Sequence, residues 1–150
     1  MPRDDDARAT ALRLLARREH SAVELAGKLR ARGFEEPAVE RCIAELAGER
    51  LLSDERFVES FVRSRIDRGQ GPYRIRAELQ ERGVAAEAID AGLEQAEVEW
   101  AALAAEQRRR RFGAERPSEF KERARQARFL QYRGFSAEQI RAALESDDWE

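Results

Sequence analysis

The chain has 150 residues, of which 42% are apolar and 39% charged, and its formal net charge is −2. This length fits one domain or a short array of small units, and the slightly negative charge excludes a uniformly basic protein that coats nucleic acid. A single cysteine excludes an internal disulfide and a cysteine-rich metal site, and with no signal peptide and no long apolar run we expect a soluble, cytoplasmic protein.

Three helices are predicted at the start of the chain. The first runs roughly from Asp5 to Arg18. The second begins at Ser21, because Ser21–Glu24 fits the capping-box pattern, and it ends at Gly33. Pro37 suits the first turn of a third helix, which follows directly.

Three more helices are predicted in the middle of the chain. The first begins at Ser53–Asp54, ends at about Asp67 and carries an apolar stripe of Phe and Val residues. The segment Gly69–Pro72 is a strong break, and its proline suits the first turn of the next helix. That helix ends at Gly83, and one more helix follows it.

The last part of the chain repeats this plan with a less distinct beginning. A helix is expected roughly over Ala96–Phe112, and its boundary with the preceding helix falls within Glu94–Trp100. Ser118 is expected to cap the next helix, which runs to Arg133, and Ser136–Gln139 fits the capping box of a final helix. Because no stretch shows sustained alternation with period two, no strands are predicted.

All three sets of helices contain the tripeptide Arg-Gly-apolar. Its glycines are separated by 50 and 51 residues, and the copies are Arg32-Gly33-Phe34, Arg82-Gly83-Val84 and Arg133-Gly134-Phe135. Glycine lacks a Cβ, so it can end a helix at positive φ. The apolar positions six and ten residues after it are four apart, so they share one face of the next helix.

The chain is therefore predicted to be all-α, with three tandem three-helix repeats over residues 1–52, 53–96 and 97–150. Because a compact sphere has too little surface for so many charged side chains, we expect the repeats to form an elongated, curved array. One position departs from the repeat, since Gln126 stands where the other copies have Leu25 and Ile75.

Charge is unevenly distributed along the chain. No Lys or Arg lies between Gly83 and Gln107, whereas Arg108–Arg133 contains ten basic and three acidic residues. The run Arg108–Arg111 is either a solvated helix end, whose cations offset the helix dipole, or part of a basic surface that meets an acidic protein groove or a phosphate backbone. A second basic set surrounds Gly69–Pro72, and any single member of it can equally be an ordinary surface residue. The candidate residues for binding a partner or DNA are Arg63, Arg65, Arg68, Arg74, Arg76, Arg108, Arg109, Arg110, Arg111, Arg125, Arg128 and Arg133.

Residues suited to catalysis are few. His20 is the only histidine and is expected to be a capping or surface residue rather than a general base. Cys42 stands where the other repeats have Gly and Ala, so it is expected to be a small buried residue. No phosphate-binding loop is found, since Gly69-Gln70-Gly71 lacks the following Gly-Lys-Ser/Thr. We therefore expect no enzymatic activity, no catalytic residues, no metal and no cofactor.

Several segments resemble the RecX family of regulatory proteins. They are Asp54–Arg65, Gly69–Leu79, Gly83-Val84, Arg128–Leu130 and Arg133–Ser136, and the similarity covers nearly the whole chain. The central string, Asp-Glu followed by Gly-x-Gly-Pro-x-x-Ile-x-x-Glu-Leu, is fairly specific, and the tandem three-helix organisation matches as well.

The resemblance implies a protein that binds the RecA recombinase, chiefly its filament on single-stranded DNA. Separately from the resemblance, we expect a monomer. Such a protein lies in the helical groove of the filament, spans neighbouring subunits, and inhibits strand exchange and ATP hydrolysis. It acts in DNA repair, recombination and the SOS response. Direct contact with the single-stranded DNA is left open.

Two other hypotheses are considered. A stand-alone helical DNA-binding protein is suggested by the likeness of a three-helix unit to a helix-turn-helix, together with the basic segments. Against it stand the slightly negative net charge and the acidic helix that follows Gly83. An enzyme is disfavoured because no site for catalysis is found.

Overall fold

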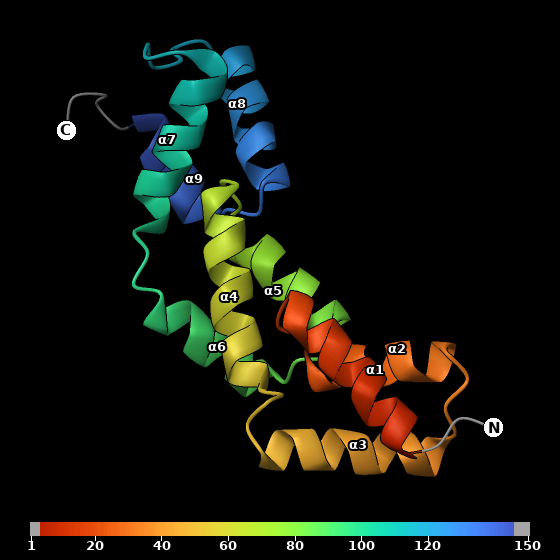
Figure 1. Ribbon diagram of the computed structural model, residues 1–150. Coiled ribbons are helices and arrows are strands. Elements are labelled where there is room, and N and C mark those ends of the chain that lie inside the picture. The colour runs from red at the N-terminus through yellow and green to blue at the C-terminus, as the bar shows by residue number, and fades with distance from the viewer. Residues whose placement is uncertain (1–3, 146–150) are drawn as a thin grey trace. The chain divides into compact units, whose positions relative to one another are not determined.

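The computed structural model describes residues 4–145, which form nine helices and no strands (Figure 1). Within this range no helix combines the length and the apolar character that a membrane span requires. The triplets α1–α3, α4–α6 and α7–α9 confirm the predicted fold of three tandem three-helix repeats. The helices are α1 (Asp4–Arg17), α2 (Ala22–Ala31), α3 (Glu36–Gly48), α4 (Asp54–Asp67), α5 (Pro72–Glu81), α6 (Ala86–Gln95), α7 (Trp100–Phe112), α8 (Phe120–Tyr132) and α9 (Ala137–Glu145).

The chain folds into two compact units. Unit 1 comprises Met1–Phe61 and Leu79–Gly92, and unit 2 comprises Val62–Glu78 and Leu93–Glu150. The first repeat therefore lies in unit 1 and the third in unit 2. The second repeat contributes to both, because α4, α5 and α6 each contain a point at which the chain passes from one unit to the other.

In unit 1 the helices of the first repeat pack against one another, α1 against α2 and α3, and α2 against α3. Their apolar faces meet because the buried positions recur at helical spacing. Cys42 is buried in this core, which confirms its interpretation as a small interior residue. The buried cluster consists of Ala7, Ala11, Leu14, Leu25, Ala26, Leu29, Val39, Cys42, Leu46 and Leu52.

In unit 2 α7 packs against α8 and α9, and α8 packs against α9. The departure at Gln126 is accommodated by a hydrogen bond, because its buried side-chain amide donates from Nε2 to Oε1 of Glu122 at 2.9 Å. The side-chain oxygen Oε1 of Gln126 is buried without a hydrogen-bond partner among the described residues, so only the amide nitrogen is satisfied. The buried apolar cluster consists of Ala104, Ala105, Leu130, Phe135, Ile140, Ala143 and Leu144.

The three Arg-Gly-apolar segments end α2, α5 and α8 in the same way, as predicted. Gly33, Gly83 and Gly134 have φ of 92°, 78° and 99°. Each glycine N–H donates to the carbonyl three residues earlier, and the next N–H donates to the carbonyl five residues earlier. This Schellman arrangement needs a residue that tolerates the left-handed conformation, which explains the glycines.

The predicted helix starts are partly correct. The capping boxes at Ser21 and Ser136 are present, each hydroxyl accepting from the backbone N–H three residues later. The expectation for Ser118 is wrong, since Glu119 holds the N-cap position of α8 and its side chain makes no capping hydrogen bond.

The boundary before the third repeat lies within Glu94–Trp100, as predicted, but the next helix begins later than expected. Helix α7 begins at Trp100 and not at Ala96. Glu97 has a φ of 51°, and its N–H donates to the carbonyl of Glu94 at 3.1 Å. A non-glycine residue in the left-handed region here ends α6, and composition gives no sign of it because glutamate favours helices.

The Arg-Gly turn of the second repeat contacts the α1–α2 junction, within unit 1. The hydroxyl of Ser21 donates to the carbonyl of Arg82 at 2.7 Å. The side chain of Val23 fills the space in which a Cβ on Gly83 would lie. We call these four residues joint 1.

The Arg-Gly turn of the third repeat contacts the α4–α5 junction in an equivalent way, within unit 2. The N–H of Gly71 donates to the carbonyl of Arg133 at 2.7 Å, and the N–H of Tyr73 donates to the carbonyl of Gly134 at 3.0 Å. We call these four residues joint 2. The tripeptide that ends a helix therefore also connects consecutive repeats, except at Gly33, where the corresponding space is open.

Candidate functional site

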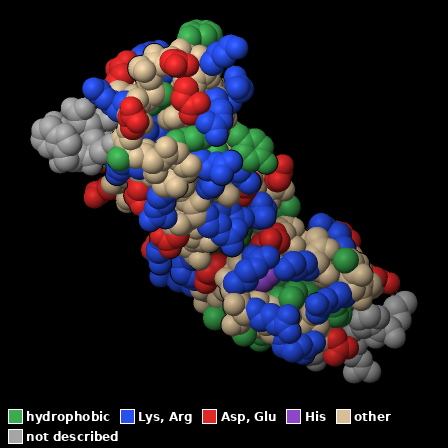
Figure 2. All heavy atoms as spheres, turned by 90° about the horizontal axis from the view of Figure 1, so that it is seen from above, with side chains coloured by type: hydrophobic (Ala, Val, Ile, Leu, Met, Phe, Trp, Pro, Cys, Tyr) green, Lys and Arg blue, Asp and Glu red, His purple; other side chains and the backbone are tan. Residues whose placement is uncertain are grey.

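All twelve candidate arginines lie in unit 2. They come from the end of α4 and the turn after it, the start of α5, the end of α7, and α8 with the turn that follows it. On the face that Figure 2 shows, Lys and Arg side chains cover more of the surface than Asp and Glu, and hydrophobic side chains lie beside them. Six of the twelve candidate arginines are exposed: Arg63, Arg68, Arg110, Arg111, Arg125 and Arg128. Five are half-buried: Arg65, Arg74, Arg76, Arg109 and Arg133. Arg108 is buried.

Arg108 was expected on the partner-binding surface, and its burial contradicts this. Its side chain is 0% exposed. The guanidinium donates to the carbonyls of Gly113 at 3.4 Å and Glu115 at 3.2 Å. Arg108 lies on the same face of α7 as Ala104 and Ala105, which are buried in the core. It therefore holds the segment after α7 in place, and only the other arginines of this run remain available to a partner.

Arginine and aromatic side chains alternate where α7 and α8 face each other. The rings of Phe112 and Phe129 make an edge-to-face contact with centroids 5.3 Å apart. The guanidinium of Arg125 lies 4.9 Å from the centre of the Phe112 ring, and that of Arg133 lies 5.1 Å from Phe129. Arg111 lies 5.9 Å from each ring. Such cation–π contacts fix the direction of the guanidinium groups.

Joint 2 brings the two basic sets together. Arg133, after α8, donates from Nη1 to the carbonyl of Arg68, after α4, at 2.8 Å. Arg74, at the start of α5, places its guanidinium 5.4 Å from the centre of the Tyr132 ring at the end of α8. Arginines that are far apart in the sequence thus lie side by side in unit 2.

Several of these charges are compensated within the chain. Arg65 donates to Glu78 at 2.8 Å and Arg74 donates to the same carboxylate at 3.3 Å. Burial alone would raise the pKa of Glu78, but these two guanidinium groups outweigh it and hold the pKa below its usual value. This carboxylate therefore stays ionised and neutralises part of the charge at joint 2.

The exposed arginines of this set differ in whether they form an ion pair. Arg110 pairs with Glu106 at 2.8 Å and Arg125 with Glu122 at 2.7 Å. By contrast, Arg68, Arg111 and Arg128 form no ion pair with any residue of the described part of the chain, and Arg111 lies against two aromatic rings. Arg68 and Arg128, which make no such contact, are the members best placed to attract an anionic partner.

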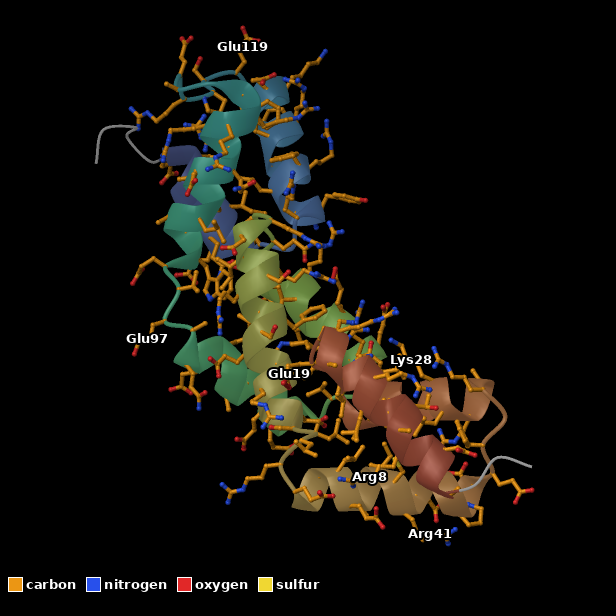
Figure 3. The ribbon with its side chains drawn as sticks, in the orientation of Figure 1. Arg8, Glu19, Lys28, Arg41, Glu97 and Glu119 are labelled. Carbon is orange, nitrogen blue, oxygen red and sulfur yellow. The ribbon has the colours of Figure 1, made fainter. Side chains whose placement is uncertain are left out.

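The acidic stretch of the sequence is also at the surface. Glu87, Asp90, Glu94, Glu97 and Glu99 are all exposed. Figure 3 shows Glu97 extending outward from the connection between α6 and α7. The charge asymmetry of the sequence is therefore an asymmetry of exposed side chains.

His20 was expected to be a cap or a surface residue and is instead buried, with 1% exposure. Its Nδ1 lies 3.1 Å from the carbonyl of Arg18, and its Nε2 lies 2.9 Å from Nζ of Lys28. Because a lysine ammonium can only donate, Nε2 accepts and Nδ1 carries the hydrogen. Burial lowers the pKa of His20, and the charges of Arg18 and Lys28 lower it further against the hydrogen bond to the Arg18 carbonyl. In the described residues no group of three or more His, Cys, Asp or Glu side chains is placed to hold a metal.

Two exposed tyrosines at joint 2 were missed from the sequence. Tyr73 is 61% and Tyr132 is 77% exposed. Aligning the repeats on their glycines places Tyr73 opposite the exposed Val23 and the half-buried Ala124, and Tyr132 opposite the exposed Ala31 and Glu81. The sequence signal that could have identified these tyrosines is an aromatic side chain at a position where the other repeats have no large aromatic residue.

Comparison with known proteins gives matches along the whole chain. Residues 7–46, 53–93 and 97–144 match the family models for the first, second and third three-helix domains of RecX. A protein of Halorhodospira halophila named "Regulatory protein RecX" is 55% identical over 94% of this chain and 88% of its own length. One of Pseudomonas entomophila with the same name is 49% identical over 94% of this chain and 91% of its own length. The crystal structure of RecX from Lactobacillus salivarius superposes with a TM-score of 0.82 at 21% identity, covering 98% of this chain and 97% of that one.

Proposed function

The chain belongs to the RecX family, and on that premise we propose that it regulates the RecA recombinase by binding RecA and its filament on single-stranded DNA. It lies in the groove of the filament and inhibits recombinase activity in DNA repair and recombination. The same proposal assigns it to the cytoplasm, where a recombinase works on chromosomal DNA.

The observation that carries this proposal is that all three repeats match the three RecX domains in the same order. The relatives are named as regulatory proteins, which supports a role in binding rather than in catalysis. Tandem repeats suit binding to a large partner, because each repeat adds its own exposed surface to the surface available for contact.

Unit 2 supplies the surface that we assign to the partner. A recombinase filament on DNA carries phosphates and protein carboxylates, and unpaired arginines attract both. Arg108 is left out of this set because it is buried. The proposed contact residues are Arg63, Arg65, Arg68, Arg74, Arg76, Arg109, Arg110, Arg111, Arg125, Arg128 and Arg133.

The test is inhibition of DNA-dependent ATP hydrolysis by RecA as the protein is titrated in. The double variant Arg68→Glu with Arg128→Glu removes the two exposed charges that lack both an ion pair and an aromatic contact among the described residues. We expect it to need about ten times more protein for the same inhibition, because reversed charges repel the anionic partner.

The matched control is Arg32→Glu with Arg50→Glu, which makes the same charge change at two exposed arginines of unit 1. We expect it to inhibit like the unaltered protein. If both double variants lost inhibition equally, the change in net charge would explain the loss, and the positions of Arg68 and Arg128 would not matter. Failure of the unaltered protein to bind RecA filaments at low salt would refute the proposal.

A stand-alone DNA-binding protein is the competing function, and a salt series separates the two. Binding to DNA phosphates releases counterions, so affinity for bare DNA falls steeply with salt. We expect RecA filaments to be preferred over bare single-stranded DNA at every salt concentration. A strong preference for bare DNA would favour the competing function.

A further inference from the structure

Two large aromatic side chains stand exposed on the two segments that meet at joint 2. Tyr73 is the second residue of α5 and Tyr132 is the last residue of α8. Their exposed fractions, 61% and 77%, show that neither ring contributes much to the core of unit 2. Exposed tyrosine rings suit binding because they offer large contact area at a low cost in conformational entropy.

The backbone beneath these rings is fixed. Tyr73 donates its N–H to the carbonyl of Gly134, two residues after Tyr132, and the neighbouring bond from Gly71 to Arg133 is short at 2.7 Å. A Cβ on Gly71 would overlap the backbone of Gly134, so the two segments are in direct contact. The guanidinium of Arg74 lies 5.4 Å from the centre of the Tyr132 ring and further orients that ring.

The surroundings of the two rings are positively charged. Arg68 and Arg128 have no ion pair among the described residues, and Arg133 donates its hydrogen bond to a neutral carbonyl. The carboxylate of Glu78 is bonded by both Arg65 and Arg74, so it carries little uncompensated charge. The surroundings of joint 2 thus combine flat aromatic faces with two cations that lack carboxylate partners among the described residues, Arg68 and Arg128, and with Arg74, which shares the carboxylate of Glu78 with Arg65.

We propose that joint 2 binds single-stranded nucleic acid, with bases stacked on Tyr73 and Tyr132 and phosphates held by Arg68, Arg74 and Arg128. Aromatic faces flanked by arginines match unpaired bases, whose own faces are free to stack. In a duplex the base faces are already stacked, and an acidic peptide offers charge without flat rings. The inference rests on the proposed function for its biological ligand, which is the DNA strand of the filament.

The test compares two fluorescein-labelled probes by anisotropy at constant salt: a thymidine oligonucleotide and an abasic oligomer of the same length. We expect the oligonucleotide to bind more tightly, because only it can stack. Tyr73→Leu and Tyr132→Leu are each expected to weaken its binding about tenfold, and to leave the weaker binding of the abasic oligomer unchanged. Tyr73→Phe and Tyr132→Phe keep the ring and are expected to keep the affinity.

The matched control is Phe120→Leu, which removes another exposed aromatic of α8, one that is 85% exposed and begins the helix. We expect it to bind the oligonucleotide like the unaltered protein. Equal binding of both probes, or full affinity in the variant that combines both leucines, would overturn the inference and show binding by charge alone.

Inhibition of RecA ATP hydrolysis by the same variants separates this inference from the proposed function. Loss of oligonucleotide binding with retained inhibition supports the stacking site and shows that recombinase contacts dominate. Unaltered oligonucleotide binding overturns the stacking site whatever the inhibition assay gives. An unaltered protein that fails to inhibit RecA would count against the proposed function alone.

Discussion

Joint 1 and joint 2 connect consecutive repeats at equivalent positions but use different chemistry. In joint 1 a side-chain hydroxyl, that of Ser21, reaches the carbonyl of Arg82 at 2.7 Å. In joint 2 the equivalent contact is made by the backbone, since the N–H of Gly71 reaches the carbonyl of Arg133 at 2.7 Å. Both satisfy the same orphan carbonyl at the end of a helix.

The difference shows what each joint demands of the sequence. A hydrogen bond from a side chain depends on the identity of one residue. A hydrogen bond between backbone groups depends instead on how closely the two backbone segments approach each other. Close approach excludes a Cβ, and in joint 2 both Gly71 and Gly134 would meet the opposite segment if they carried one. Joint 2 is therefore expected to be the more sensitive to added volume, and joint 1 to the loss of a polar group.

The largest expected effect comes from adding a methyl group to the repeated glycine. Gly134→Ala should destabilise the protein by about 3 kcal/mol, because strain at a φ of 99° adds to overlap with the backbone of Arg74. Gly83→Ala meets only the side chain of Val23, so about 2 kcal/mol is expected. Urea unfolding monitored by circular dichroism gives both values.

Gly33→Ala is the control for that series. Its φ of 92° imposes the same backbone strain, but nothing lies within 4 Å of the added methyl group. About 1 kcal/mol is expected from strain alone. If all three alanine variants lost equal stability, the joints would contribute nothing and only the helix ends would matter.

Removing the hydroxyl of joint 1 should have the next largest effect. Ser21→Ala removes the cap of α2 and also the bond to Arg82, so about 2 kcal/mol is expected. Ser136→Ala removes the equivalent cap of α9, with about 1 kcal/mol expected. The difference between the two variants measures the bond across joint 1, and the idea fails if their midpoints in urea shift equally.

The residue that precedes each joint in the sequence differs, and this difference should make the free energy of unfolding depend on pH through the first junction only. His20 lies thirteen residues before Gly33, and Gln70 lies thirteen before Gly83. Burial holds the pKa of His20 below that of the exposed ring in the unfolded chain, which is about 6.5. As the pH falls below about 6.5, the unfolded chain binds the proton first, so the free energy of unfolding decreases.

His20→Gln places the residue of the second junction into the first. We expect this variant to lose the part of the pH dependence between pH 7 and pH 5 that belongs to the histidine. Unfolding midpoints in urea measured at intervals across this range test it. Parallel profiles for both proteins would show that His20 is protonated equally in the folded and the unfolded state.

Much of this architecture could be predicted from the sequence, because its determinants are local. Positive φ at Gly33, Gly83 and Gly134 follows from the glycine alone, and the apolar spacing after each glycine predicts the buried face of the next helix. The left-handed conformation of Glu97 could not be predicted, because glutamate favours helices and ordinarily has negative φ.

The site was less predictable than the fold, since it depends on which face of a helix meets the core. Four consecutive arginines cover a full turn of α7, and only packing decides that Arg108 is the one that points inward. Likewise His20 looks like a polar junction residue until Lys28, on the next helix, is seen to donate to it. Contacts between elements decided both outcomes.

The smallest expected effect concerns the guanidinium of joint 2. Arg133 donates to the carbonyl of Arg68 and lies over the ring of Phe129, and a lysine cannot hold both contacts with one ammonium. Arg133→Lys should therefore cost about 1 kcal/mol, whereas Arg128→Lys, at an exposed site without an ion pair among the described residues, should change stability by less than about 0.5 kcal/mol. Thermal unfolding of the two variants resolves this difference. A cost of zero for Arg133→Lys would mean that the two backbone hydrogen bonds hold joint 2 without help from the side chain, which would sharpen its contrast with joint 1.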